Sequence, residues 1–206
     1  FSLPIPNILC QNFRMKRILA PILLLILLFP SLAYGETIID LVKRDGLYYK
    51  KFTDVPFTGK ITGGTQATFK DGKAIGPWIT YHDNGQLWFK ETYKDGKLDG
   101  PYVYYYTGGQ LAWKGNYKDG KKDGTWINYH DNGQLRDKGN YKDGKRDGPW
   151  VSYHDNGQLQ SKGNYKDGKR DGPWVFFYKN GTKRFNAKRW GWDKGTGTYK
   201  NGVKVK

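Results

Sequence analysis

Cysteine is almost absent from this 206-residue chain, which carries only Cys10. Cys10 precedes the apolar run near the N-terminus, so it cannot be the lipid-modified cysteine that follows an export sequence. Residues 36–206 therefore have no disulfide, no thiol nucleophile and no cysteine-based metal site. Small exported domains often depend on disulfides, so packing and strand pairing must stabilise this one.

Long hydrophobic runs are scarce too. The longest, residues 18–29, is too short to cross a bilayer comfortably as a helix, which needs about 20 residues. Met15, Lys16 and Arg17 stand before it, and the small-residue segment 30–35 follows it. This order is typical of a secretory signal peptide, although an uncleaved membrane anchor is the alternative.

We therefore predict a signal peptide at 15–35, cleaved after Gly35, and a periplasmic or extracellular location for the rest of the chain. Residues 1–14 contain no methionine and precede a complete signal pattern. We interpret them as a disordered upstream extension from an overlong gene prediction.

Acidic side chains are few. Arg14, Lys16 and Arg17 are the only charged residues before position 36, so residues 36–206 keep 32 of the 35 basic side chains and all 19 acidic ones, a net charge of +13. Such an excess favours contact with an anionic lipid, cell-wall polymer or acidic protein. The alternative is that the cations only keep the protein soluble. Export makes nucleic acid an unlikely partner, and we predict none.

Tandem repetition dominates the remaining sequence. Copies of 24 residues begin at positions 67, 91, 115, 139 and 163, without insertions, and fill 67–186. We predict that the segment 36–66 is an N-terminal cap and that 187–206 is a divergent C-terminal cap, since end repeats of such arrays are usually atypical.

Each copy is predicted to contain two strands and two turns. In the last full copy, residues 159–165 alternate in polarity with a period of two, and the aromatic run 174–178 is typical of a second strand. Asp-Gly and Asp-Asn-Gly triplets such as 155–157 favour turns with positive φ. Proline stands before the aromatic run, for example at Pro149 and Pro173, and is expected at the first strand position, where a missing donor does least harm.

The predicted fold is an all-β, elongated, single-layer antiparallel meander of hairpins, preceded by a signal-peptide helix. Residues 36–206 contain 20 Leu, Ile and Val but 30 Phe, Tyr and Trp, too few aliphatics for a two-layer core. Each repeat advances the sheet by roughly 10 Å, so equivalent residues of successive repeats are not expected to touch. Trp150 should instead contact residues of the flanking strands, such as leucine, tyrosine or the small Gly139 and Gly163.

The repeats resemble MORN repeats, in the bacterial variant found in YwqK-family antitoxins. The residues that carry the resemblance recur every 24 positions and are, in one copy, Tyr141, Gly144, Gly148, Trp150, Tyr153, Gly157 and Leu159. An opening motif at residues 44–49 and 56–59 resembles the start of the same family. The resemblance implies a module for protein interaction or membrane association, and the antitoxin name implies a toxin as partner.

No catalytic constellation is found in the sequence, which has no nucleophile elbow, zincin motif or phosphate loop. His82, His130 and His154 share one turn position, and equivalent side chains of adjacent repeats are roughly 10 Å apart, which disfavours a metal site. Lysine and arginine interleave with the aspartates of the Asp-Gly turns, which disfavours calcium. We predict no enzyme activity, no metal and no cofactor.

Two surfaces are candidates for binding. The first hypothesis is a protein-interaction scaffold in the cell envelope that uses an aromatic face, with the residues Trp78, Trp126, Trp150, Trp174, Tyr141 and Tyr165. The second is a binder of anionic membrane or cell-wall surfaces that uses a row of cations at the hairpin ends, Lys121, Lys122, Lys145, Arg146, Lys169 and Arg170. The third, an antitoxin or immunity protein, rests on the resemblance.

Overall fold

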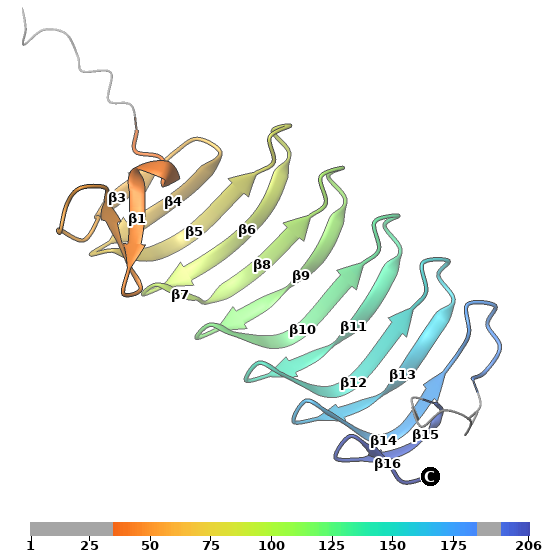
Figure 1. Cartoon of the computed structure of the whole chain (residues 1–206). Coiled ribbons are helices and arrows are strands. Elements are labelled where there is room, and N and C mark those ends of the chain that lie inside the picture. The colour runs from red at the N-terminus through yellow and green to blue at the C-terminus, as the bar shows by residue number, and fades with distance from the viewer. Residues whose placement is uncertain (1–34, 185–194) are drawn as a thin grey trace, which may run out of the picture. The chain divides into compact units, whose positions relative to one another are not determined.

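The computed structural model describes residues 35–184 and 195–206 (Figure 1). The predicted signal-peptide helix and upstream extension lie outside the described residues. A short 3-10 helix, η1 (Ile38–Asp40), leads into a two-stranded sheet of β1 (Leu41–Arg44) and β2 (Leu47–Lys50). All other described strands join one sheet.

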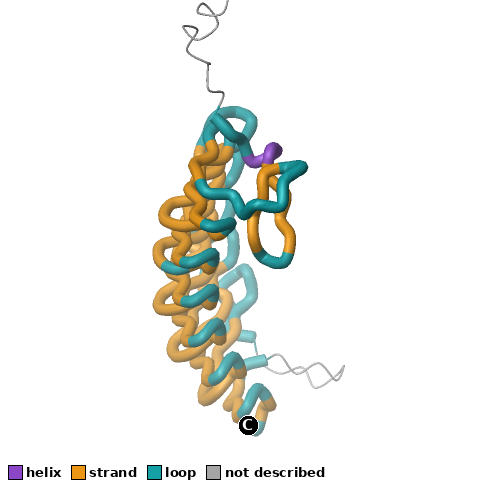
Figure 2. Tube along the Cα trace, turned by 90° about the vertical axis from the view of Figure 1, so that its left-hand side faces the viewer, coloured by secondary structure: helices purple, strands orange, loops and turns teal. Residues whose placement is uncertain are grey.

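That sheet has 14 strands, which follow one another in chain order and pair antiparallel, with β7 placed beside β6. Figure 2 shows that the strands form one layer. The prediction of an all-β single-layer meander is therefore confirmed. The strands are β3 (Gly59–Ile61), β4 (Thr65–Lys70), β5 (Lys73–Tyr81), β6 (Leu87–Lys94), β7 (Lys97–Leu98), β8 (Gly100–Tyr105), β9 (Leu111–Lys118), β10 (Lys121–Tyr129), β11 (Leu135–Lys142), β12 (Lys145–Tyr153), β13 (Leu159–Lys166), β14 (Lys169–Phe176), β15 (Gly197–Lys200) and β16 (Val203–Lys204).

The hairpin turns are those that the sequence predicts. At the turn between β11 and β12, Asp143 has φ +51° and Gly144 has φ +82°, the backbone of a type I′ turn, which matches the twist of the strands it joins. At the opposite edge, Gly157 has φ +79° and donates its N–H to the carbonyl of His154, closing the Asp-Asn-Gly turn. Two kinds of turn therefore alternate along the sheet, one at each edge.

In four of the five repeats the second strand starts earlier than predicted, directly after the Asp-Gly turn. β12 begins at Lys145, directly after the Asp-Gly turn, and Pro149 lies in its interior. The proline is tolerated because the register of β12 against β11 shifts between the pairs Tyr141↔Arg146 and Gly139↔Trp150. Pro149 sits in this bulge, where no ladder bond to β11 is lost. The prediction that these prolines begin their strands is wrong.

Successive repeats also touch at their turns, and there one equivalent pair, Asp155 and Lys179, forms an ion pair at 2.6 Å, contrary to the prediction. Gly144, in the turn after β11, donates its N–H to the carbonyl of Lys122 at the start of β10, at 2.9 Å. At the other edge His154 Nε2 lies 3.1 Å from the carbonyl of Phe177, and Asn156 donates its amide to the carbonyl of Lys179 at 2.8 Å. The turns extend beyond the paired part of the strands, so the turn regions of successive repeats contact each other directly.

Residues 36–66 form no repeat. Leu41 and Ile61, from β1 and β3, pack in one cluster with Phe69 and Trp78 from the first repeat hairpin. Tyr48 of β2 covers this cluster, with its ring 4.9 Å from that of Phe69. The first repeat therefore buries its aromatic residues against a segment of different sequence.

Candidate functional site

The sheet has two chemically different faces. The face that carries Trp78, Trp126, Trp150 and Trp174 is called here the tryptophan face. Each of these indoles is buried, with between 1% and 8% of the residue exposed. They form the main apolar packing of a sheet that has no second layer.

Glycine on the neighbouring strand makes room for three of the four indoles, Trp126, Trp150 and Trp174. Trp150 pairs with Gly139 on one side and Gly163 on the other. A methyl group placed on Gly139 would lie 2.0 Å from a ring carbon of Trp150, and one on Gly163 would lie 2.3 Å from Trp174. The predicted contact of Trp150 with Gly139 is therefore confirmed, and these glycines are required by the indoles.

Tyrosines complete the packing between tryptophans. Tyr141 lies edge-on between Trp126 and Trp150, with centroid distances of 6.1 and 5.7 Å, and Tyr165 lies between Trp150 and Trp174 at 5.7 and 5.0 Å. Edge-to-face pairs of this kind are favourable. Both tyrosines are half-buried. The six aromatic residues predicted to bind a partner thus lie on the same face of the sheet, but mainly as its core.

Half of the predicted cationic row lies on the tryptophan face, over the rings. Lys122 Nζ is 4.0 Å from the centroid of Trp126, and the guanidinium carbons of Arg146 and Arg170 are 4.3 and 4.8 Å from those of Trp150 and Trp174. Cation–π contacts at these distances are attractive. Burial, and next the charge of Arg146, lower the pKa of Lys122.

Only Lys121, Lys145 and Lys169 of that row remain exposed beside the Asp-Gly turns without a tryptophan beneath them. The six cations therefore do not form a single row at one edge. The two cations that follow each Asp-Gly turn are adjacent in the strand, so their side chains point in different directions. One lies on the tryptophan face, and the other lies beside the turn.

Sequence reasoning missed a third row of the tryptophan face. In the earlier repeats this row consists of Phe89, Tyr104 and Trp113, called here the aromatic patch, which are paired neighbours on β6, β8 and β9. The rings of Tyr104 and Trp113 stack at 4.0 Å and 8°. All three side chains are half-buried. Comparing equivalent positions of the copies would have revealed it, because the equivalents in the following copies are polar, namely Asn128, Asp137, Ser152 and Ser161, until Phe176 in the last copy.

A buried carboxylate is the second feature that was missed. Glu91 occupies the position at which later repeats have glycine, pairs with Trp78, and is 9% exposed. Tyr93 donates its hydroxyl to Glu91 Oε1 at 2.9 Å. Burial raises the pKa of Glu91 above the ordinary glutamate value of 4.5, and the hydrogen bond from Tyr93 opposes this shift.

We expect Glu91→Gln to stabilise the protein at neutral pH. Because the folded state holds the Glu91 proton to higher pH than the unfolded state does, stability is lost as pH rises from about 4.5 through the raised pKa. Glutamine does not titrate, so the variant does not lose this stability as the pH rises. Urea unfolding of both proteins at several pH values measures it: the free-energy difference should grow with pH, and a constant difference would refute the assignment.

The three histidines are held by the turns. His82, His130 and His154 are half-buried, and each ring Nε2 lies 3.0–3.2 Å from the carbonyl of a residue in the next repeat. Within the residues that the structure describes, no three His, Cys, Asp or Glu side chains converge as metal ligands. The same part of the chain has no helix with the length and apolarity to cross a membrane.

Comparison with known proteins identifies the repeats. A family model described as "MORN repeat variant" matches residues 75–95, 98–119, 122–143 and 146–167. No curated protein matches the chain in sequence. A solved structure entitled "Crystal structure of GtfA/B complex bound to UDP and GlcNAc" is similar with a TM-score of 0.18 and 12% identity over 75% of this chain. The similar region covers 26% of that protein's chain.

Proposed function

This chain is a MORN-repeat protein, with four tandem repeat variants in residues 75–167, and on that premise we propose that it is a non-enzymatic binding scaffold of the cell envelope. The envelope location rests on the predicted signal peptide at 15–35. The binding surface is the aromatic patch of Phe89, Tyr104 and Trp113, which engages a protein partner.

One observation carries this proposal: the fold does not require the patch. The stacked pair Tyr104↔Trp113 has the same place in the sheet as the pair Ser152↔Ser161 two repeats later. The sheet is continuous at both places, so aromatic rings there are not needed for strand pairing. Half-exposed Trp and Tyr residues are the side chains that most often dominate the affinity of protein interfaces.

The double variant Tyr104→Ser/Trp113→Ser tests the proposal. Partner capture from envelope extracts by the full chain should fall by a factor of ten or more, because truncating one such anchor typically costs about 2 kcal/mol. The fold should persist, as judged by circular dichroism. Tyr178→Ser is the matched control, since Tyr178 is an aromatic residue 49% exposed outside the patch. Undiminished capture by the folded double variant would contradict the proposal.

Binding of an anionic membrane or cell-wall surface through the hairpin turns is the second candidate. It is favoured by the net charge of +13 of residues 36–206 and by the exposure of Lys121, Lys145 and Lys169. It ranks second because the other three cations of the proposed row lie over indole rings. The antitoxin role has the resemblance alone as its support.

A further inference from the structure

The face opposite the tryptophans carries a regular row of lysines. Residues that pair between neighbouring strands form a line across the sheet from β5 to β14. Along this line lysine alternates with isoleucine or valine. The lysines, called here the lysine row, are Lys90, Lys114, Lys138 and Lys162. The aliphatic residues between and beside them are Ile79, Val103, Ile127, Val151 and Val175.

The ammonium groups of the lysine row are exposed and uncompensated. Each lysine is exposed, and the aliphatic residues between them are half-buried. Among residues 35–184 and 195–206, the ion pairs of the structure involve none of these four lysines. The residues two positions away on the same strands, such as Asn140 and Asn164, are never acidic. The row is therefore a line of positive charge with no internal partner.

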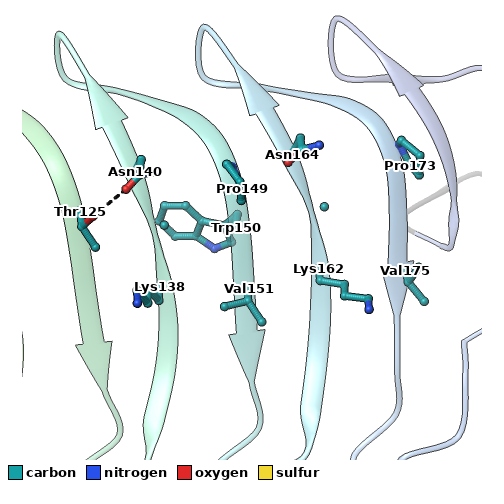
Figure 3. A pocket seen from close by; sticks show the side chains of 12 residues that line it. Thr125, Lys138, Asn140, Pro149, Trp150, Val151, Lys162, Asn164, Pro173 and Val175 are labelled. Carbon is teal, nitrogen blue, oxygen red and sulfur yellow. Dashed lines mark hydrogen bonds between the residues drawn. The ribbon is translucent and has the colours of Figure 1, made fainter.

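Two of the four lysines of the row, Lys138 and Lys162, lie in an open cavity. A volume of about 630 Å³ is lined by Lys138, Lys162, Val151 and Val175, with a parallel line of asparagine and proline beside them. Figure 3 shows Lys138, Val151, Lys162 and Val175 in one row across the strands, with Asn140, Pro149, Asn164 and Pro173 in the next. One ammonium, one carboxamide and one apolar surface thus recur together on β11 and β12, and again on β13 and β14.

The distance between neighbouring lysines of the row indicates which class of ligand it fits. Neighbouring lysines are two strands apart, which corresponds to roughly 10 Å. A nucleic-acid strand carries a phosphate about every 3.4 Å, about three for each lysine. The row instead matches a linear polymer with sparse charges, hydrogen-bonding groups and apolar surfaces between them, which is the chemistry of an acidic polysaccharide with one carboxylate on every second sugar.

We propose that the lysine row is a binding site for a linear acidic polysaccharide that lies across the strands, each lysine pairing with a successive carboxylate. The asparagine line provides hydrogen bonds to the sugar hydroxyls, and the aliphatic residues contact the apolar faces of the rings. This site is on the opposite face from the aromatic patch, so its test is independent of the proposed protein partner.

The same chain provides a matched comparison. One variant replaces the lysine row with glutamine, as Lys90→Gln, Lys114→Gln, Lys138→Gln and Lys162→Gln. The other removes the same charge from exposed lysines that follow the Asp-Gly turns, as Lys97→Gln, Lys121→Gln, Lys145→Gln and Lys169→Gln. Binding of the full chain and of both variants is measured on immobilised hyaluronate, which has one carboxylate on every second sugar, on uncharged dextran and on anionic vesicles.

The row variant should lose affinity for hyaluronate on the order of a thousandfold, since four cations near an anionic partner are removed, and the turn variant should change severalfold at most. Neither protein should bind dextran. Equal losses in both variants would show unspecific charge attraction and overturn the site, as would binding to anionic vesicles without binding to hyaluronate. If the quadruple variant does not fold, Lys138→Gln/Lys162→Gln gives the same comparison against Lys145→Gln/Lys169→Gln.

Discussion

Replacing Trp150 with alanine is expected to lower the free energy of unfolding by about 3–5 kcal/mol, the usual cost of removing a buried tryptophan. Trp150 is 5% exposed, fills the space over Gly139, and carries Arg146 on its ring. A single-layer sheet has no second layer that could collapse into the cavity. Urea unfolding followed by circular dichroism measures the loss.

The same substitution at an exposed indole is the control. Trp88 is 37% exposed, so Trp88→Ala should cost about 1 kcal/mol. Equal unfolding midpoints for the native chain and Trp150→Ala would show that the buried indoles are not the core. In that case the tryptophans would again be candidates for direct contact with a partner.

Gly139→Val is expected to destabilise the protein by about 1–3 kcal/mol, the typical effect of overpacking a filled site. The first carbon of the new side chain would lie 2.0 Å from Trp150, so the indole must move, and Arg146 above it must move as well. The backbone of Gly139 is not at positive φ, so the effect reports packing and not backbone strain. Thermal unfolding of the full chain gives the size of the effect.

Lys138→Val places the same side chain one residue earlier, on the exposed opposite face. Its effect should stay within about 0.5 kcal/mol. A similar loss in both variants would mean that the register of β11 and β12, and not the indole, limits substitution at Gly139.

Much of the fold could be predicted because its causes are local. The 24-residue period, the Asp-Gly turns and the alternation of residues 159–165 are all visible in the sequence, and each has a direct backbone consequence. The excess of aromatic over aliphatic residues was enough to exclude a second layer. The glycines beside Trp150 followed from the spacing of strands.

The details that determine the site depend on contacts between strands. Lys121 and Lys122 look equivalent in the sequence, yet one is exposed beside the turn and the other lies over Trp126. The start of β12 at Lys145 depends on a bulge that tolerates Pro149, which composition does not reveal. The lysine row is also hidden, because its members are 24 residues apart and become a line only when the register of every strand is known.

The hydrogen bonds between turns affect how such a protein can change in length. Gly144 bonds to Lys122 and His154 contacts Phe177, pairs that are 22 and 23 residues apart. Lengthening one loop by a few residues would break bonds to both neighbouring repeats. Duplication or deletion of a whole 24-residue copy would recreate every bond at the junction. Evolution of this sheet is therefore expected to proceed by complete repeats, each of which adds or removes one lysine of the row.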